Sequence, residues 1–241
     1  MTEVSEHAPF DDRTHHGPRW LKSFRPWATM RRRARRGIII AGAAYLAAVV
    51  PFHGAVAVGV VVARFQGRAP QAPVSIDIEN LRRVDDRVWA SGQPDARRYG
   101  ELSAAGVEAI VDLRTGVADD RNEVDHAELA RVGIDYVRLP VKDGHVPDDE
   151  TVLHFLDVVD RHDGIVLLHC GAGVGRSSTL ASGYLAHQDQ RVSLWDTLAL
   201  GSVTMEQAWF LVSGQRNAGI RRLSEALDAP RRGWNRFLSM L

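Results

Sequence analysis

The segment HCGAGVGRSS, residues 169–178, combines groups that could bind and attack a phosphate. Cys170 is a potential nucleophile, and the glycines at 171, 173 and 175 allow the following backbone to fold tightly, with several N–H groups turned toward one anion. A helix beginning near Arg176 would add the positive end of its dipole. The planar guanidinium of Arg176 can hold two phosphate oxygens. The same positive field would stabilise a Cys170 thiolate, and Ser177 could donate a hydrogen bond to it.

Each of these residues, taken alone, has an ordinary structural explanation. A cysteine at a strand end is usually a small core residue, and a histidine before it, here His169, is usually hydrogen-bonded within the core. An arginine at a helix start is usually a surface charge. Their coincidence around a glycine-rich loop favours the chemical interpretation. The phosphate-binding residues predicted on this basis are Gly171, Ala172, Gly173, Val174, Gly175 and Arg176.

Cys170 is the single cysteine of the 241-residue chain. An intramolecular disulfide and a multi-cysteine zinc site are therefore both excluded, and the neighbours of Cys170 must define its role.

The elements that must position these residues follow from apolar patterning. From Ile78 onward, short apolar runs alternate with longer amphipathic stretches, several of which begin at an Asp or Ser suited to an N-cap. Strands are predicted at 87–91, 109–113, 136–141 and 165–169, and helices at 95–105, 125–132, 148–161, 176–187, 206–215 and 224–241. Strands that alternate with helices predict a three-layer α/β domain, with a largely parallel central sheet flanked by helices.

The loop matches the His-Cys-x5-Arg-Ser/Thr pattern, and the chain thereby resembles the cysteine-dependent protein tyrosine and dual-specificity phosphatases. The segment NLRRVDDRVWASGQPD (80–95), followed by GVEAIVDLR (106–114), is similar to the opening of the atypical dual-specificity phosphatases of bacteria, plants and fungi. The resemblance covers about residues 78–215. Low-molecular-weight tyrosine phosphatases and arsenate reductases share the Cys-x5-Arg spacing, but their loop lies near the N-terminus of the domain, whereas about ninety domain residues precede it here.

The resemblance implies a mechanism without a cofactor or a metal. Cys170 would attack phosphorus, Arg176 would hold the equatorial oxygens, and a cysteinyl-phosphate would form and be hydrolysed. The family takes the leaving-group proton from an Asp on a loop after an earlier strand. Asp143, the first carboxylate after the strand YVRLPV, is the favoured candidate. Its rivals, Asp148 and Asp149, precede an apolar helix and suit N-caps better.

Two other charged residues, Asp112 and Arg114 in the segment VDLR, are assigned to structure or to the rim of the site rather than to catalysis.

The substrate class is constrained by the loop, whose positions 171–175 carry no positive charge. Family members that act on inositol phosphates commonly place Lys or Arg there, so inositol polyphosphates are disfavoured. Three hypotheses follow: a protein tyrosine or dual-specificity phosphatase, a lipid or small-molecule phosphomonoesterase, and a non-catalytic phosphate-binding module. The third is disfavoured because the candidate nucleophile, arginine and acid are all present.

Charge is balanced overall but divided along the chain. Thirty basic and thirty acidic residues disfavour a globally basic nucleic-acid binder, and no nucleic-acid partner is expected. Residues 1–36 nevertheless contain nine basic and four acidic side chains, a net charge of +5, which leaves −5 for the rest. That remainder has an ordinary globular composition and can bury a core.

An uncharged apolar run, residues 38–63, is long enough to cross a bilayer. Two alternatives stay open: a pair of buried core helices, and a cleaved signal peptide ending near the small residues at 55–57. The cluster RRRARR before the run favours a single transmembrane helix. The predicted organisation is a basic segment 1–37, a transmembrane helix 38–63, a linker 64–77 and a phosphatase domain 78–241.

Orientation follows from the flanks of the apolar run. Residues 23–37 contain six arginines and residues 64–78 contain two. The positive-inside rule therefore predicts a cytoplasmic N-terminus and an extracytoplasmic catalytic domain. A reactive thiol and a phosphoprotein substrate would suit the cytoplasm better. The expected partners are the lipid bilayer and a phosphoprotein or membrane-surface phosphomonoester substrate.

Overall fold

The computed structural model describes residues 25–116 and 124–228. The chain divides into two compact units, Met1–Ala48 and Val49–Leu241. Helix α1 (Arg25–Phe65) begins in the first unit and ends in the second, and all of the described strands belong to the second.

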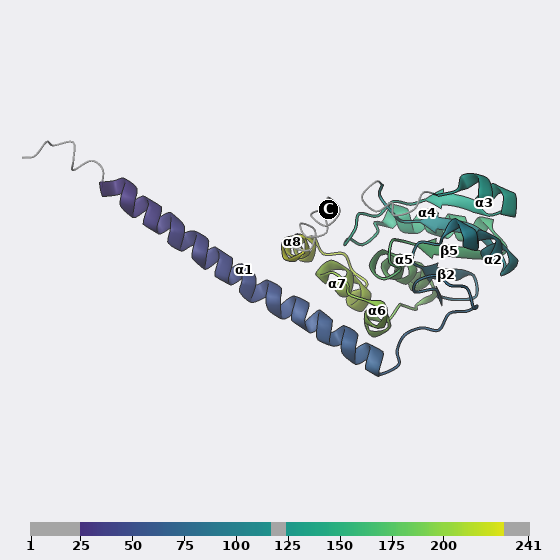
Figure 1. Cartoon of the computed structure of the whole chain (residues 1–241), viewed down its shortest axis with the longest axis horizontal. Helices are drawn as coiled ribbons and strands as arrows, with labels where there is room; N and C mark the ends of the chain where they lie inside the picture. The colour runs from purple at the N-terminus through teal and green to yellow at the C-terminus, as the bar shows by residue number, and fades with distance from the viewer. Residues whose placement is uncertain (1–24, 117–123, 229–241) are drawn as a thin grey trace, which may run out of the picture. The chain divides into compact units, whose positions relative to one another are not determined.

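A five-stranded sheet forms the centre of the second unit (Figure 1). Its strands are β1 (Arg82–Arg83), β2 (Val88–Ser91), β3 (Val107–Asp112), β4 (Asp135–Arg138) and β5 (Ile165–His169). The spatial order is β1-β2-β5-β3-β4, and only the edge pair β1 and β2 is antiparallel. The largely parallel sheet expected from the sequence is confirmed, and the predicted strand 165–169 matches β5 residue for residue.

The helices described in this unit follow the expected order, except that the helix Leu194–Leu200 was not predicted. They are α2 (Tyr99–Ala104), α3 (His126–Val132), α4 (Asp149–Arg161), α5 (Gly175–Leu185), α6 (Leu194–Leu200), α7 (Met205–Ser213) and α8 (Ala218–Leu227), with 3-10 turns at Ala96–Arg98 and Ala186–Gln188. Asp125 and Asp148 cap α3 and α4 as predicted, because each side chain accepts a hydrogen bond from a backbone N–H of the first turn.

The last helix was predicted over residues 224–241, and its predicted starting residue is wrong. Helix α8 begins at Ala218, because the side chain of Asn217 accepts hydrogen bonds from the N–H groups of Gly219 and Ile220 and caps it there. It ends at Leu227, and the predicted continuation from residue 229 lies outside the described residues.

Two hydrophobic cores lie on opposite faces of the sheet and create the three layers. Strand β5 shows the division, since Val166 and Leu168 join one core and Leu167 joins the other. The first core includes Phe155 of α4 and Leu180 of α5, and the second includes residues of α2 and α3. A central strand covered on both faces must be apolar throughout, which explains the run IVLL.

The carboxyl ends of three parallel strands meet at one edge of the sheet. Ser91 at the end of β2 and Asp112 at the end of β3 both pair in register with His169 at the end of β5. Residues that follow these strands are therefore brought together, which is where open α/β sheets place their ligand sites.

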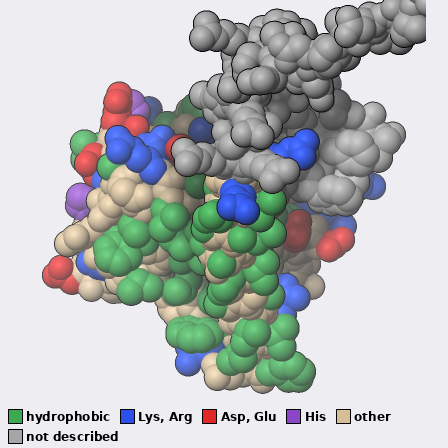
Figure 2. All heavy atoms as spheres, turned by 90° about the vertical axis from the view of Figure 1, so that its left-hand side faces the viewer, with side chains coloured by type: hydrophobic (Ala, Val, Ile, Leu, Met, Phe, Trp, Pro, Cys, Tyr) green, Lys and Arg blue, Asp and Glu red, His purple; other side chains and the backbone are tan. Residues whose placement is uncertain are grey.

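Helix α1 contains an apolar segment, Ala34–Phe65, that is long enough to cross a membrane. Its large apolar side chains include Ile38, Ile39 and Ile40, each about 70% exposed. Hydrophobic side chains are prominent on the face of the molecule in Figure 2. Within the second unit, Ala63 of α1 packs in a small core with Val174 and Leu198.

Candidate active site

The loop after β5 has a conformation that requires glycine at one position. Gly173 has a φ of +72°, and a Cβ there would lie 2.3 Å from the backbone nitrogen of Gly92. Both the left-handed conformation and the close approach of two backbones exclude a side chain. The loop is thus pressed against the end of β2, and helix α5 begins directly after it at Gly175.

Three carbonyl groups of the loop accept hydrogen bonds from residues that lie outside the loop. The carbonyl of Gly171 accepts from the N–H of Gln93 at 3.0 Å. The carbonyl of Ala172 accepts from Asn80 Nδ2 at 2.8 Å, and that of Gly173 from Arg82 Nη1 at 2.7 Å. In a planar trans peptide the carbonyl and the next N–H point in opposite directions. The N–H groups of residues 172–174 are therefore turned away from these donors, which gives the anion nest predicted from the glycine spacing its structural basis.

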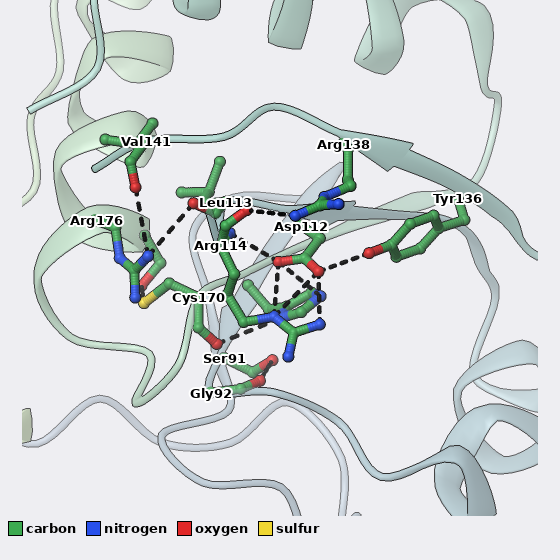
Figure 3. Close-up of polar contacts among 12 residues, drawn as sticks. Ser91, Gly92, Asp112, Leu113, Arg114, Tyr136, Arg138, Val141, Cys170 and Arg176 are labelled. Atoms are coloured by element: carbon green, nitrogen blue, oxygen red, sulfur yellow. Dashed lines mark hydrogen bonds and ion pairs between the residues drawn. The ribbon is translucent and has the colours of Figure 1, made fainter. Parts of the chain in front are cut away.

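Arg176 is buried beside Cys170 at the start of α5 (Figure 3). Its Nη1 donates to the carbonyl oxygens of Leu113, 3.4 Å away, and Val141, 3.3 Å away. These two carbonyls follow β3 and β4, so the sheet topology fixes the position of the guanidinium. The structure brings the predicted cysteine and arginine together.

Cys170 is 3% exposed, and its Sγ lies 3.7 Å from the hydroxyl oxygen of Ser177. Ser177 is fully buried in the first turn of α5. A thiolate cannot donate, so in that state the Ser177 hydroxyl would be the donor of this contact.

Asp143 is the one of the three candidate acids that lines the same cavity as Cys170 and Arg176. Its Oδ1 lies 3.7 Å from Arg176 Nη2, and its side chain is 60% exposed. Asp148 instead accepts hydrogen bonds from the N–H and hydroxyl of Thr151, at 2.8 and 2.6 Å, as the N-cap of α4. Asp149 forms an ion pair with Arg216.

The loop that carries Asp143 is tied to the first turn of α7. Thr204 Oγ1 donates to the carbonyl of Gly144 at 2.7 Å, and Gln207 Nε2 donates to the carbonyl of His145 at 3.2 Å. The imidazole Nδ1 of His145 lies 2.8 Å from Glu206 Oε2. The capping box formed by Thr204 and Gln207 is a visible sequence signal for this turn, but its contact with the Asp143 loop was not predicted.

Behind Cys170, a buried polar cluster joins the ends of β3, β4 and β5 (Figure 3). Arg114 Nη2 donates to Asp112 Oδ2 at 2.7 Å, and Tyr136 Oη donates to the same oxygen at 2.6 Å. Burial raises the pKa of Asp112, but the hydrogen bonds from Arg114 and Tyr136 outweigh it and lower the pKa to about 2. The geometry places Asp112 and Arg114 in the structural frame.

His169 belongs to this cluster, with its Nε2 3.8 Å from Asp112 Oδ1 and its Nδ1 3.3 Å from the carbonyl oxygen of Cys170. Burial lowers the pKa of His169 to about 4, although the charge of Asp112 acts in the opposite direction. The imidazole is therefore neutral at neutral pH and supports the loop without adding a charge.

A cavity of about 270 Å³ opens above the loop. Its wall contains Cys170, Arg176 and Asp143, together with Glu79, Gln207 and the segment 200–202. Sequence reasoning missed Glu79 and Gln207 as lining residues, because neither belongs to the loop motif. Within residues 25–116 and 124–228, no cluster of three or more His, Cys, Asp or Glu could hold a metal ion.

Comparison of the chain with known proteins identifies a family and several relatives. The family described as "DSP-PTPase phosphatase fused to NAD+ Kinase" matches residues 68–212, more than half of the chain. The tyrosine-protein phosphatase cdc-14 of Caenorhabditis elegans is 45% identical over 56 residues, which are 23% of this chain and 8% of that protein. The dual specificity protein phosphatase CDC14C of Homo sapiens is 33% identical over 97 residues, 38% of this chain and 22% of that protein.

Among solved structures, P. aeruginosa TpbA is similar over 65% of this chain and 96% of its own, with 24% identity and a TM-score of 0.46. The chain spans less than a quarter of the length of the two curated relatives. The resemblance of the loop and of the segment before it to dual-specificity-type phosphatases is nevertheless confirmed by the family match. The chain belongs to the DSP-PTPase family of cysteine-dependent phosphatases.

Proposed function

We propose that this protein hydrolyses phosphomonoesters through a cysteinyl-phosphate intermediate. The observation that carries the proposal is the convergence of Cys170, Arg176 and Asp143 on one cavity, from the loop after β5 and the loop after β4. The thiolate of Cys170 attacks phosphorus in line with the ester oxygen. Arg176 and the loop N–H groups hold the equatorial oxygens as charge redistributes.

In the first step the sulfur–phosphorus bond forms and the phosphorus–oxygen ester bond breaks, with Asp143 giving its proton to the leaving oxygen. In the second step a water attacks phosphorus, and the Asp143 carboxylate accepts a proton from it. The sulfur–phosphorus bond breaks, and the Ser177 hydroxyl, 3.7 Å from Sγ, stabilises the departing thiolate. Inorganic phosphate leaves, and the starting protonation of both residues is restored.

The preferred substrate class is a phosphorylated protein, with phosphate on tyrosine, serine or threonine. The charges of the cavity support this choice: Arg176 is the one cation among its described lining residues, and Glu79 and Asp143 are acidic. Such a cavity neutralises a single phosphate and repels a polyanion. The names of the relatives, a tyrosine-protein and a dual specificity phosphatase, agree with it.

A lipid or small-molecule phosphomonoester is the second candidate. The observation that favours it is the apolar segment Ala34–Phe65, because a domain carried by a membrane helix meets lipid headgroups at high local concentration.

We also propose that residues 38–63 form a transmembrane helix between a basic segment 1–37 and a linker 64–77, with the catalytic domain 78–241 outside the cytoplasm. The exposed side chains of Ile38, Ile39 and Ile40 support membrane insertion, since water would not favour them. The six arginines of residues 23–37 support the orientation.

The test uses the detergent-solubilised full chain on phosphotyrosine, phosphoserine and phosphothreonine peptides and on vesicles of anionic phospholipid monoesters, side by side. The expected result is phosphate release from peptides and a loss of more than about a thousandfold in kcat for Cys170→Ser, or about 4 kcal/mol. Arg176→Lys should also be severely impaired. Faster release from vesicles than from peptides would select the lipid candidate. Activity retained by Cys170→Ser would exclude the covalent mechanism.

A further inference from the structure

A second buried arginine lies beneath the phosphate-binding loop, on the opposite side from Arg176. Strand β1 consists of Arg82 and Arg83, and the alternation of a strand turns the first inward and the second outward. Arg82 is 4% exposed, whereas the side chain of Arg83 is 57% exposed and pairs with Asp86. The proposed mechanism uses neither of them.

The hydrogen bonds of the Arg82 guanidinium lead to the loop, to the first turn of α5 and to Asn80, which itself binds the loop. Nη1 donates to the carbonyl of Gly173 at 2.7 Å and to the carbonyl of Asn80 at 3.1 Å. Nη2 donates to the hydroxyl of Ser178 at 2.9 Å and, more weakly, to that of Ser177 at 3.4 Å. One planar group thus ties the last loop carbonyl to the first turn of α5.

These contacts have a stereochemical consequence for the loop. The carbonyl of Gly173 points at Arg82, so the N–H of Val174, on the same peptide plane, points the other way, toward the phosphate site. Gly173 has a left-handed backbone, which is only one of the several conformations that are open to glycine. The hydrogen bond from Arg82 fixes this peptide before any phosphate arrives.

The hydrogen bonds of Arg82 also affect Cys170, through the hydroxyl of Ser177. Guanidinium is a donor only, so the oxygen of Ser177 accepts from Arg82 and its proton is free to point at Cys170 Sγ, 3.7 Å away. Arg82 therefore selects the hydroxyl orientation that stabilises a thiolate.

The charge of Arg82 lacks a carboxylate partner within residues 25–116 and 124–228. Burial lowers the pKa of Arg82 to about 10, and the charge of Cys170 acts in the opposite direction. The guanidinium still carries its proton at neutral pH. A buried cation without an acidic partner is unfavourable unless an anion lies near, and the Cys170 thiolate is the anion that this site can supply.

We propose that Arg82 is a positioning residue for the phosphatase reaction, which orients the Gly173–Val174 peptide and the Ser177 hydroxyl and serves as the buried counter-charge of the Cys170 thiolate. This inference rests on the proposed function in one respect, the role of Cys170 as the nucleophile.

The test compares Arg82→Met and Arg82→Lys with Arg83→Met, a matched control on the exposed side of the same strand. The first measurement is the rate of alkylation by iodoacetamide against pH in the full chain. Cys170 is the single cysteine, so the reacting thiol is unambiguous. In Arg82→Met the midpoint of the alkylation profile should move upward by about one pH unit or more, because the thiolate loses its buried counter-charge. Arg83→Met should follow the wild-type profile.

The second measurement is turnover of an aryl phosphate together with inhibition by vanadate. Arg82→Met should lose about tenfold or more in kcat/KM and bind vanadate more weakly, because the N–H of Val174 is no longer fixed. Arg82→Lys keeps the charge but lacks the planar fork. It should therefore keep an alkylation midpoint near that of the wild type and still bind vanadate more weakly.

The proposal is overturned if folded Arg82→Met matches the wild type in both the alkylation profile and vanadate binding. If Arg82→Met does not fold, Arg82→Lys decides, and wild-type vanadate binding by that variant overturns the proposal. The alkylation profile does not depend on turnover. A wild-type chain without phosphatase activity would therefore refute the proposed function, whereas an upward shift in Arg82→Met would still support the role of Arg82.

Discussion

Asp143 and Arg176 form an ion pair in the wall of the cavity, with Oδ1 of the first 3.7 Å from Nη2 of the second. The guanidinium is buried and held by the carbonyls of Leu113 and Val141, whereas the carboxylate is mostly exposed. Asp143 therefore lies where it could reach the leaving oxygen of a phosphate bound in the loop. This relationship distinguishes Asp143, the proposed general acid, from Asp148, which caps α4.

Asp143→Asn should slow hydrolysis in a way that depends on the leaving group. Phenyl and alkyl phosphates need a proton on the departing oxygen, so their kcat should fall by about a hundredfold or more. Aryl phosphates with acidic phenols should lose about tenfold or less, since they depart unprotonated. Initial rates on both substrate types measure the difference.

The matched control is Asp148→Asn, because asparagine is as good an N-cap as aspartate and should preserve α4. Its rates should equal those of the wild type. Equal losses on both substrate types in Asp143→Asn, or a larger loss in Asp148→Asn, would place the general acid elsewhere.

Acidification should destabilise the fold through His169. Burial lowers the pKa of His169 to about 4, although Asp112 opposes this, whereas an unfolded histidine titrates near about 6.5. Between these two values the unfolded chain binds a proton that the folded chain does not. The free energy of unfolding should thus fall as the pH falls through this window, by on the order of 2 kcal/mol between about pH 7 and about pH 5.

Urea denaturation of the wild type and His169→Gln at these two pH values isolates that contribution. Glutamine does not titrate, so the variant should show a smaller difference between the two conditions. His154→Gln, on the exposed side of α4, is the control and should retain the wild-type difference. The same pH dependence in His169→Gln as in the wild type would show that His169 is not its source.

Gly173→Ala should disrupt the loop. A Cβ at this position would lie 2.3 Å from the nitrogen of Gly92 and 2.4 Å from the carbonyl carbon of Ser91, and its φ is +72°. Because both neighbours are backbone, we expect a lower melting temperature and a loss of about a hundredfold or more in kcat/KM.

Gly100→Ala is the matched control for this substitution. Gly100 lies in α2, and a Cβ there would meet no atom within 4 Å. Alanine should stabilise the helix by up to about 1 kcal/mol and leave turnover unchanged. Wild-type turnover by Gly173→Ala would show that the loop tolerates a different backbone path.

The orientation of the proposed membrane helix is tested by fusing reporters after Leu241. The charge asymmetry around residues 38–63 predicts that an export-dependent reporter is active and a cytoplasm-only reporter is silent. Resistance of the fusion to alkaline extraction from membranes tests the anchor separately. Activity of the cytoplasmic reporter alone would contradict the proposed orientation but not the membrane anchor. A fully soluble fusion would contradict both.

The features that sequence could predict are those encoded over short distances. The apolar run of β5, the three glycines after it and the arginine at the start of α5 are adjacent in the chain, and their local geometry follows from residue type. Asp148 could be assigned as an N-cap because the residues that satisfy it, Thr151 above all, lie within one turn.

Short elements escaped sequence prediction. The two residues of β1 are too few for apolar periodicity to identify, and the helix α6 was also missed. Arg82 consequently had no recognisable place in the fold, since two adjacent arginines are ordinarily a solvated pair.

Tertiary structure decided which distant residues support the nucleophilic loop. The hydrogen bond from Arg82 to Gly173 joins residues that 90 others separate in the chain, and it exists because β1 pairs with β2 and β2 with β5. Gln207 reaches the Asp143 loop in the same way, through the packing of α7. The sequence by itself predicted the nucleophile, the arginine and the anion nest. Only strand order and helix packing determined their supports, because such contacts depend on long-range geometry that no local pattern encodes.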